Sequence, residues 1–210
     1  TVDKRYSHSE LDGKNEYAYL DSDISLVFSE EVQGYNKTNT GADDVPDDFH
    51  ALYSKVLSSS GDEQVKAKAA LASALSNHIS LHTGTAPGSG NPPKDSYVTT
   101  VTASTTPEQL ANMPQWIDYR EAVVTREGGK TIITFPAGKG IQLQSGTRYY
   151  FFIRQVQDTA EPVPNTLTSA SVAIATISAR VDIKEKEDVE YAEDGRVLTS
   201  AGDAAAGDRL

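Results

Sequence analysis

The stretch EAVVTREGGKTIITF, residues 121–135, decides the fold more than any other part of the chain. Two runs rich in Val, Ile and Thr flank Gly128 and Gly129, and such runs favour β-strands. A two-residue hairpin turn needs positive φ angles, which glycine adopts without steric strain. The stretch therefore predicts an antiparallel β-hairpin that turns at the glycine pair.

Further strands are expected on both sides of this hairpin. Residues 148–156 (RYYFFIRQV) predict a central strand, and residues 24–28 show the alternation of a half-buried one. Residues 97–102 and 171–177 are also rich in β-formers. Short β-rich runs separated by turn signals are typical of a mostly β fold, a β-sandwich. The expected core residues are Leu26, Phe28, Ile132, Phe135, Tyr150 and Phe152.

One segment, residues 44–76, predicts helices instead. An apolar stripe at helical spacing runs from Phe49 to Leu57, after a start rich in acids that suits a helix N-terminus. Ser60 and Glu63 have capping-box spacing for a second helix that ends near Asn77. We expect a two-helix insertion in the β fold.

Five segments, in order, resemble the bacterial Ig-like domain found in S-layer proteins and large surface adhesins. They are LDSDISLVFSEEV (20–32), NHISL (77–81), KTIITFP (130–136), LQSGTRYY (143–150) and VQD (156–158). The resemblance implies an Ig-like β-sandwich over residues 1–180, with the helical insertion at about 44–76. Residues 181–210 are then a C-terminal extension or hairpin with a flexible end.

The composition of the chain argues against several classes of function. The chain has 30 acidic and 19 basic residues, a formal net charge of −11, so a nucleic-acid partner is not expected. It has no cysteine, which excludes a disulfide framework and a thiolate site. No apolar stretch approaches the roughly 20 residues of a membrane span. No signal peptide is seen at the start, and a first residue of Thr1 would suit a processed or excised chain.

An acidic cluster is the candidate metal site. Carboxylate oxygens are ligands that calcium prefers, but the spacing of these acids does not match a calcium-binding loop. The alternative interpretation is a capped helix start with a solvated acidic surface. The candidate ligands are Asp43, Asp44, Asp47 and Asp48.

Other chemistry is weighed against simpler interpretations. His78 and His82 have the four-residue spacing of zinc ligands on a helix, but in a strand that spacing separates them by about 13 Å. We therefore expect two separate surface histidines. Asp118 and Glu121 are one of many carboxylate pairs that an acidic protein offers for acid–base chemistry. The sequence predicts no enzyme and no cofactor other than the candidate calcium.

The resemblance implies a non-catalytic structural or adhesive module of an extracellular surface assembly at the cell surface, in an S-layer, surface filament or adhesin. The expected partners are copies of the chain or neighbouring surface-protein domains. One alternative is a carbohydrate-binding module, with glycans stacked on aromatic rings such as Trp116. Another alternative is a viral capsid or tail component.

The tail suggests how assembly would happen. Its two β-prone runs could insert as a strand into a neighbouring copy, or pair with each other as a hairpin. The assembly-strand candidates are Val189, Tyr191, Val197 and Leu198. Asn36 begins an Asn-Lys-Thr triplet and is a candidate glycosylation acceptor.

Overall fold

A computed structural model describes residues 17–35, 46–87, 90–160, 164–177, 189–191 and 197–200. The chain divides into two compact units, Thr1–Ala179 and Arg180–Leu210. The strands of the first unit are β1 (Tyr17–Tyr19), β2 (Ile24–Val27), β3 (Val32–Gly34), β4 (Ile79–Thr83), β5 (Trp116–Ile117), β6 (Val123–Glu127), β7 (Lys130–Phe135), β8 (Ile141–Gln142), β9 (Arg148–Asp158) and β10 (Thr166–Ile177). Its helices are α1 (Phe49–Ser58), α2 (Gly61–His78) and α3 (Pro107–Ala111), with short 3₁₀ turns η2 (Lys94–Ser96) and η3 (Tyr119–Glu121).

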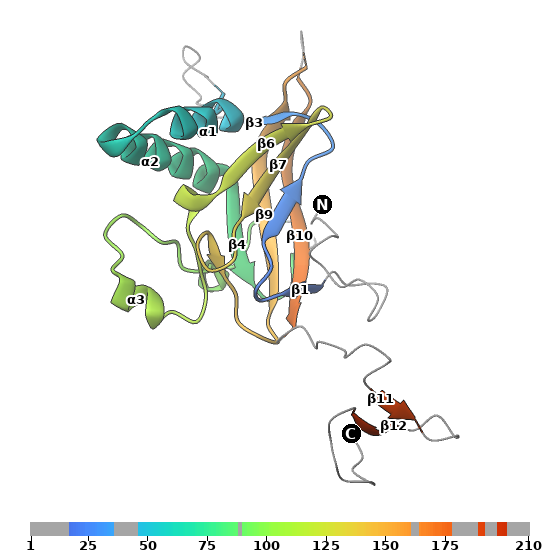
Figure 1. The fold of residues 1–210 in the computed structure, drawn as a ribbon. Helices are drawn as coiled ribbons and strands as arrows, with labels where there is room; N and C mark the ends of the chain where they lie inside the picture. The colour runs from blue at the N-terminus through green and yellow to red at the C-terminus, as the bar shows by residue number, and fades with distance from the viewer. Residues whose placement is uncertain are drawn as a thin grey trace. The chain divides into compact units, whose positions relative to one another are not determined.

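Two sheets form the body of the first unit (Figure 1). The smaller has three antiparallel strands in the order β2-β7-β6. In the larger, β9 is central: β10 pairs with one side of it, and β4 and β3 pair one after the other with its second side. β1 joins this sheet in parallel at the end of β10. The protein is therefore mostly β, and its paired strands run antiparallel except that β1 runs parallel to β10.

The glycine hairpin is confirmed. β6 and β7 pair antiparallel from Val123↔Thr134 to Glu127↔Lys130. Gly128 has a φ of 57° and Gly129 a φ of 75°, so the turn uses the conformation for which glycine is needed.

Aromatic side chains join the two sheets. Phe135 of β7 stacks on Phe151 of β9 with ring centroids 5.5 Å apart, and both are fully buried. Tyr119 meets Phe135 edge to face at 5.8 Å. This packing of one sheet on the other is compatible with a β-sandwich.

The expected core needs two changes. Leu26 and Phe135 belong to the core that joins the two sheets and the partly buried Phe28 packs against it, whereas Tyr150 and Phe152 are buried outside this core, on the face of β9 opposite Phe151. On β7, however, Ile133 is the fully buried isoleucine and Ile132 is only half-buried. Successive side chains of a strand point to opposite faces, so Ile133 shares the core face with Phe135 and Ile132 does not.

The two-helix insertion is confirmed, with ends shifted by a few residues from 44–76. Asp48 caps α1, because its carboxylate accepts a hydrogen bond from the Ala51 N–H at 3.0 Å. α2 ends at His78, and the chain continues directly into β4 (Figure 1). The apolar faces of both helices belong to the same core as the sheets; their buried members include Phe49, Val56, Leu71 and Leu75.

The long connection between β4 and β6 differs from expectation. Residues 97–102 form isolated bridges in place of a continuous strand. The Val98 N–H donates to Leu81 O of β4, whereas the Val101 N–H donates to Ile117 O of β5. Because the segment passes from one partner strand to another, it pairs regularly with neither. Within this connection, α3 begins with a capping box at Thr106.

The second unit contains β11 (Val189–Tyr191) and β12 (Val197–Ser200). They pair with each other in antiparallel fashion, from Val189↔Ser200 to Tyr191↔Val197. Within the described part of the chain, no helix is both long enough and apolar enough to cross a membrane.

Candidate functional site

The candidate calcium ligands are only partly described. Asp43 and Asp44 lie outside the described residues. Asp48 caps α1 and also forms an ion pair with the Arg126 guanidinium at 3.0 Å. These contacts match the alternative interpretation, in which the acid caps the start of a helix. Asp47 lies 3.3 Å from Nε2 of His78. Among the residues that are described, no group of three or more His, Asp or Glu side chains is arranged to hold a metal ion.

The expectation of surface histidines is wrong. His78 is the last residue of α2, with 1% of its surface exposed, and His82 of β4 is fully buried. Each imidazole has its own partners: His78 contacts Asp47 and the Arg154 carbonyl, the latter at 3.2 Å. The burial arises from long-range packing that the local pattern of the sequence does not contain.

Both ring nitrogens of His82 are held by serines. Nε2 lies 2.8 Å from Ser80 Oγ and Nδ1 lies 2.9 Å from Ser96 Oγ. The ring also stacks on Tyr150, with centroids 5.0 Å apart. Burial lowers the pKa of His82 to about 4, so the ring is neutral near pH 7. A neutral histidine with both nitrogens hydrogen-bonded links β4 to the η2 turn.

The Asp118 and Glu121 carboxylates do not act as a pair. Asp118 accepts two hydrogen bonds from the Arg120 guanidinium, at 2.8 and 2.6 Å, and these bonds raise the pKa of Arg120. Glu121 instead forms an ion pair with Lys68 of α2 at 2.7 Å. Each carboxylate therefore has its own cationic partner, and the Lys68–Glu121 ion pair links η3 to α2.

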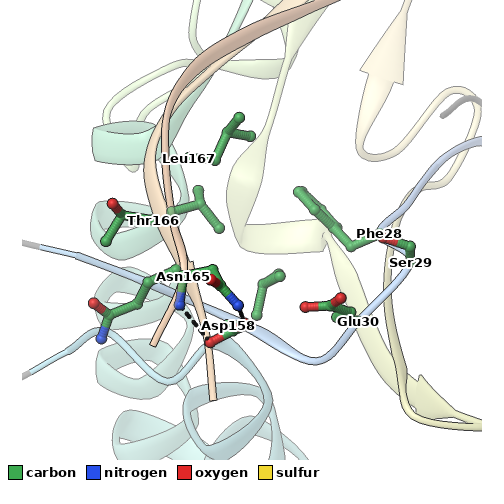
Figure 2. A pocket seen from close by; sticks show the side chains of 10 residues that line it. Phe28, Ser29, Glu30, Asp158, Asn165, Thr166 and Leu167 are labelled. Carbon is green, nitrogen blue, oxygen red and sulfur yellow. Dashed lines mark hydrogen bonds between the residues drawn. The ribbon is translucent and has the colours of Figure 1, made fainter. Parts of the chain in front are cut away.

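A pocket of about 280 Å³ lies where the β2–β3 connection meets the β9–β10 connection. Figure 2 shows Phe28, Ser29 and Glu30 on one side of it, with Asp158 and Asn165 across from them. Such a mixed apolar and acidic lining is suited to a small polar group or a peptide side chain.

Asp158 is the most strongly bonded carboxylate of this pocket. It accepts hydrogen bonds from the Asn165 side chain at 2.7 Å and from the Asn165 N–H at 2.9 Å (Figure 2). It also accepts one from the Ala160 N–H at 3.1 Å. The bond from the Asn165 side chain is the main cause that lowers the pKa of Asp158. Through these bonds the Asp158 carboxylate ties the end of β9 to Asn165, just before β10, so its role is structural. In the sequence, Asp158 stands out only as the last residue of the resembling segment 156–158, and that resemblance does not specify its hydrogen bonds.

A second and larger pocket, of about 510 Å³, lies beside Trp116. Its walls include Leu110 and Met113 near α3 and Lys139 and Gln142 near β8. Trp116 itself is 7% exposed, and Tyr119 is buried with its hydroxyl donating to Ile79 O at 2.7 Å. These two rings therefore do not form an open stacking platform, whereas Tyr97 is more than half exposed.

The remaining candidates lie in the less described parts of the chain. Asn36, the candidate glycosylation acceptor, is outside the described residues. The candidate assembly residues Val189, Tyr191, Val197 and Leu198 lie on β11 and β12, which pair with each other in the hairpin alternative.

No protein-family model, curated protein or solved structure matches this chain. What the structure defines is a class: a mostly β protein of antiparallel sheets with a pair of helices packed into the same core.

Proposed function

We propose that this chain is an Ig-like β-sandwich that serves as a non-catalytic structural or adhesive module of an extracellular surface assembly and acts by self-association. The observation that carries the Ig-like part of the proposal is the order of the strands. In a constant-type Ig domain, strand E lies between B and D in one sheet, and F lies between C and G in the other. Here β7 lies between β2 and β6, and β9 lies between β4 and β10. These strands follow one another along the chain in the order B to G.

Tyr149 supports the same assignment. Ig-like sandwiches have a tyrosine near the start of strand F whose hydroxyl bonds to the backbone a few residues upstream. Tyr149 is the second residue of β9, and its hydroxyl accepts a hydrogen bond from the Gln144 N–H at 2.8 Å. Two residues later, where antibody domains carry a disulfide cysteine, this chain has Phe151, which stacks on Phe135. A stacked aromatic pair would join the sheets in place of the disulfide.

The contacts of the charged and titratable residues support a role without catalysis. His82 is neutral and bonded on both nitrogens, and Asp158 closes a turn. Asp48 caps a helix, and Asp118 is bonded to Arg120. All four groups are engaged in contacts within the protein, which suits structural roles.

We assign self-association to this protein as its function. Sandwiches have edge strands whose N–H and C=O groups can pair with another chain. The strongly negative charge maintains solubility, as suits a protein outside the cell. Negative-stain micrographs of the purified chain test the role: filaments, sheets or discrete oligomers are expected, and a field of monomers at high concentration would refute self-association.

A carbohydrate-binding module is the second candidate, and the pocket beside Trp116 favours it. Lys139 and Gln142 provide hydrogen-bonding groups next to apolar walls in that pocket. A glycan array combined with Trp116 fluorescence separates the two functions. A binder gives a saturable change in emission with a specific glycan, while a purely structural module gives none.

A further inference from the structure

We propose that the outer edge of β10, residues 166–173, is the surface on which two copies of this chain pair, strand against strand and antiparallel. The inference rests on the proposed self-association and names the strand that carries it. It would join the larger sheets of two copies into one continuous sheet.

Among the described residues, the outer edge of β10 has a long stretch without a partner strand. β9 pairs with β10 on one side from Thr166 to Ala175. On the other side the described residues of β1, Tyr17–Tyr19, pair with residues 175–177. No other strand in the described part of the chain pairs with that side of residues 166–174. Figure 1 shows β10, in orange, at the border of the sheet, with β1 at its end.

The direction of the backbone groups follows from one hydrogen bond. The Thr176 N–H donates to Thr147 O, toward the β9 side, at 3.1 Å. Backbone groups alternate in direction along a strand, and the pairing with β9 is regular from Ser169 to Ala175. The N–H and C=O groups of Ser169, Ser171 and Ala173 therefore point away from β9, where a further strand would bond.

The other edges of this sheet are covered. The outer edge of β3 bonds to Asp47, through hydrogen bonds of 2.9 and 3.1 Å between the backbones of Gly34 and Asp47. The outer edge of β4 receives the Val98 N–H at 2.9 Å. β10 has no equivalent cover over residues 166–173 among the described residues, so it is the edge of this sheet that offers a continuous row of partners.

β10 also lacks the side chains that natural proteins use to block an edge. Edges are usually protected by lysines, other charges, prolines or bulges. No charged residue lies between Glu161 and Arg180, and β10 contains no proline. The side chains of Ser169, Ser171 and Ala173 are exposed, so nothing in them is needed for the core. Leu167, also on β10, is 39% exposed.

The proposed self-association makes a second copy the occupant, and charge favours β10 as the place where two copies meet. The chain has a net charge of −11, so two copies repel one another over most of their surface. An uncharged strand is where they can approach with the least repulsion, and β10 of a second copy presents the same uncharged strand. Antiparallel pairing of a strand with itself has twofold symmetry, so both copies use the same residues. The contact therefore gives a closed dimer, on which a second contact can build larger assemblies.

The test uses opposite charges at the centre of the edge. The variant Ser169→Lys/Ser171→Lys and the variant Ser169→Glu/Ser171→Glu each place like charges opposite each other in the dimer. Sedimentation velocity should show dimerisation weakened by roughly tenfold or more in each variant alone. An equimolar mixture should recover it, since Lys then faces Glu. A matched control, Ser54→Lys/Ser58→Lys, adds the same charge to exposed serines of α1 and should dimerise like the wild type.

The outcomes separate this inference from the proposed function. If the wild type associates and both β10 variants associate equally well, self-association stands and pairing through β10 is wrong. If both variants are folded by circular dichroism and their mixture stays monomeric, strand pairing of β10 with β10 is also wrong. A wild type that is monomeric at every concentration overturns the proposed function together with this inference.

Discussion

Replacing Tyr149 by Phe tests whether β9 begins as strand F of an Ig-like domain. The side chain is fully buried, and its hydroxyl accepts from the Gln144 N–H at 2.8 Å and donates to Gln115 Oε1 at 2.6 Å. Burial raises the pKa of Tyr149, so the hydroxyl keeps the proton that it donates. Tyr149→Phe preserves the ring and removes both hydrogen bonds.

The expected loss can be worked from these two bonds. A hydrogen bond contributes about 0.5–1.5 kcal/mol, and a fully buried partner left without one costs more. Gln144 is exposed and Gln115 half-buried, so water can reach the groups that lose their partner. We therefore expect Tyr149→Phe to lower the free energy of unfolding by about 1–2 kcal/mol.

Urea unfolding followed by Trp116 fluorescence measures this loss, with the midpoint and slope fitted separately. Tyr97→Phe is the matched control, because Tyr97 is 53% exposed and should tolerate loss of its hydroxyl. If Tyr149→Phe unfolds at the same midpoint as Tyr97→Phe, the hydroxyl of Tyr149 does not fix the start of β9 and the strand-F assignment loses its support.

Three further predictions concern individual contacts. A Cβ at Gly34 would lie 2.3 Å from His78 Nε2, so Gly34→Ala should cost about 1–3 kcal/mol in urea unfolding, and an unchanged midpoint would contradict this packing. The pKa of His82 is about 4 in the folded state and 6.5 in the unfolded state, so only the unfolded state gains a proton as pH falls between these values. His82 should therefore reduce stability over that range, and His82→Asn should make the loss with falling pH smaller than in the wild type. Asn165→Ala should raise the pKa of Asp158 in an NMR titration, because the strongest hydrogen bond to the carboxylate is lost; an unmoved pKa would contradict that cause.

Local signals in the sequence were enough for the hairpin and the helices. The glycine pair specifies a hairpin turn because glycine readily adopts the positive φ angles that the turn needs. The apolar stripe from Phe49 to Leu57 specifies a helix because its residues recur at helical spacing. Both depend on residues that are neighbours in the chain. The same logic located β2 and β9, whose apolar runs pack in the two sheets.

The features that local sequence patterns did not predict depend on contacts between residues that are far apart in the chain. Ile132 and Ile133 are chemically alike, and only the pairing of β7 with β2 and β6 determines which one faces the core. The segment 97–102 has strand composition, but its partners lie on two different strands. No spacing in the sequence encodes either outcome.

In the candidate site, too, some features follow from local sequence and others depend on long-range packing. The role of Asp48 as a helix cap follows from its position before Phe49. By contrast, the burial of His82 depends on Ser96 and Tyr150, which are 14 and 68 residues away in the sequence. The edge of β10, which has no partner strand among the described residues, can be recognised only when the pairing of the neighbouring strands is known.

The most direct test of the central claim is the sedimentation velocity of the unmodified chain from micromolar to near-millimolar concentration. The account predicts a weight-average mass that rises with concentration, with a dimer as the first species above the monomer. A single species at the monomer mass across that whole range would contradict a module that works by self-association.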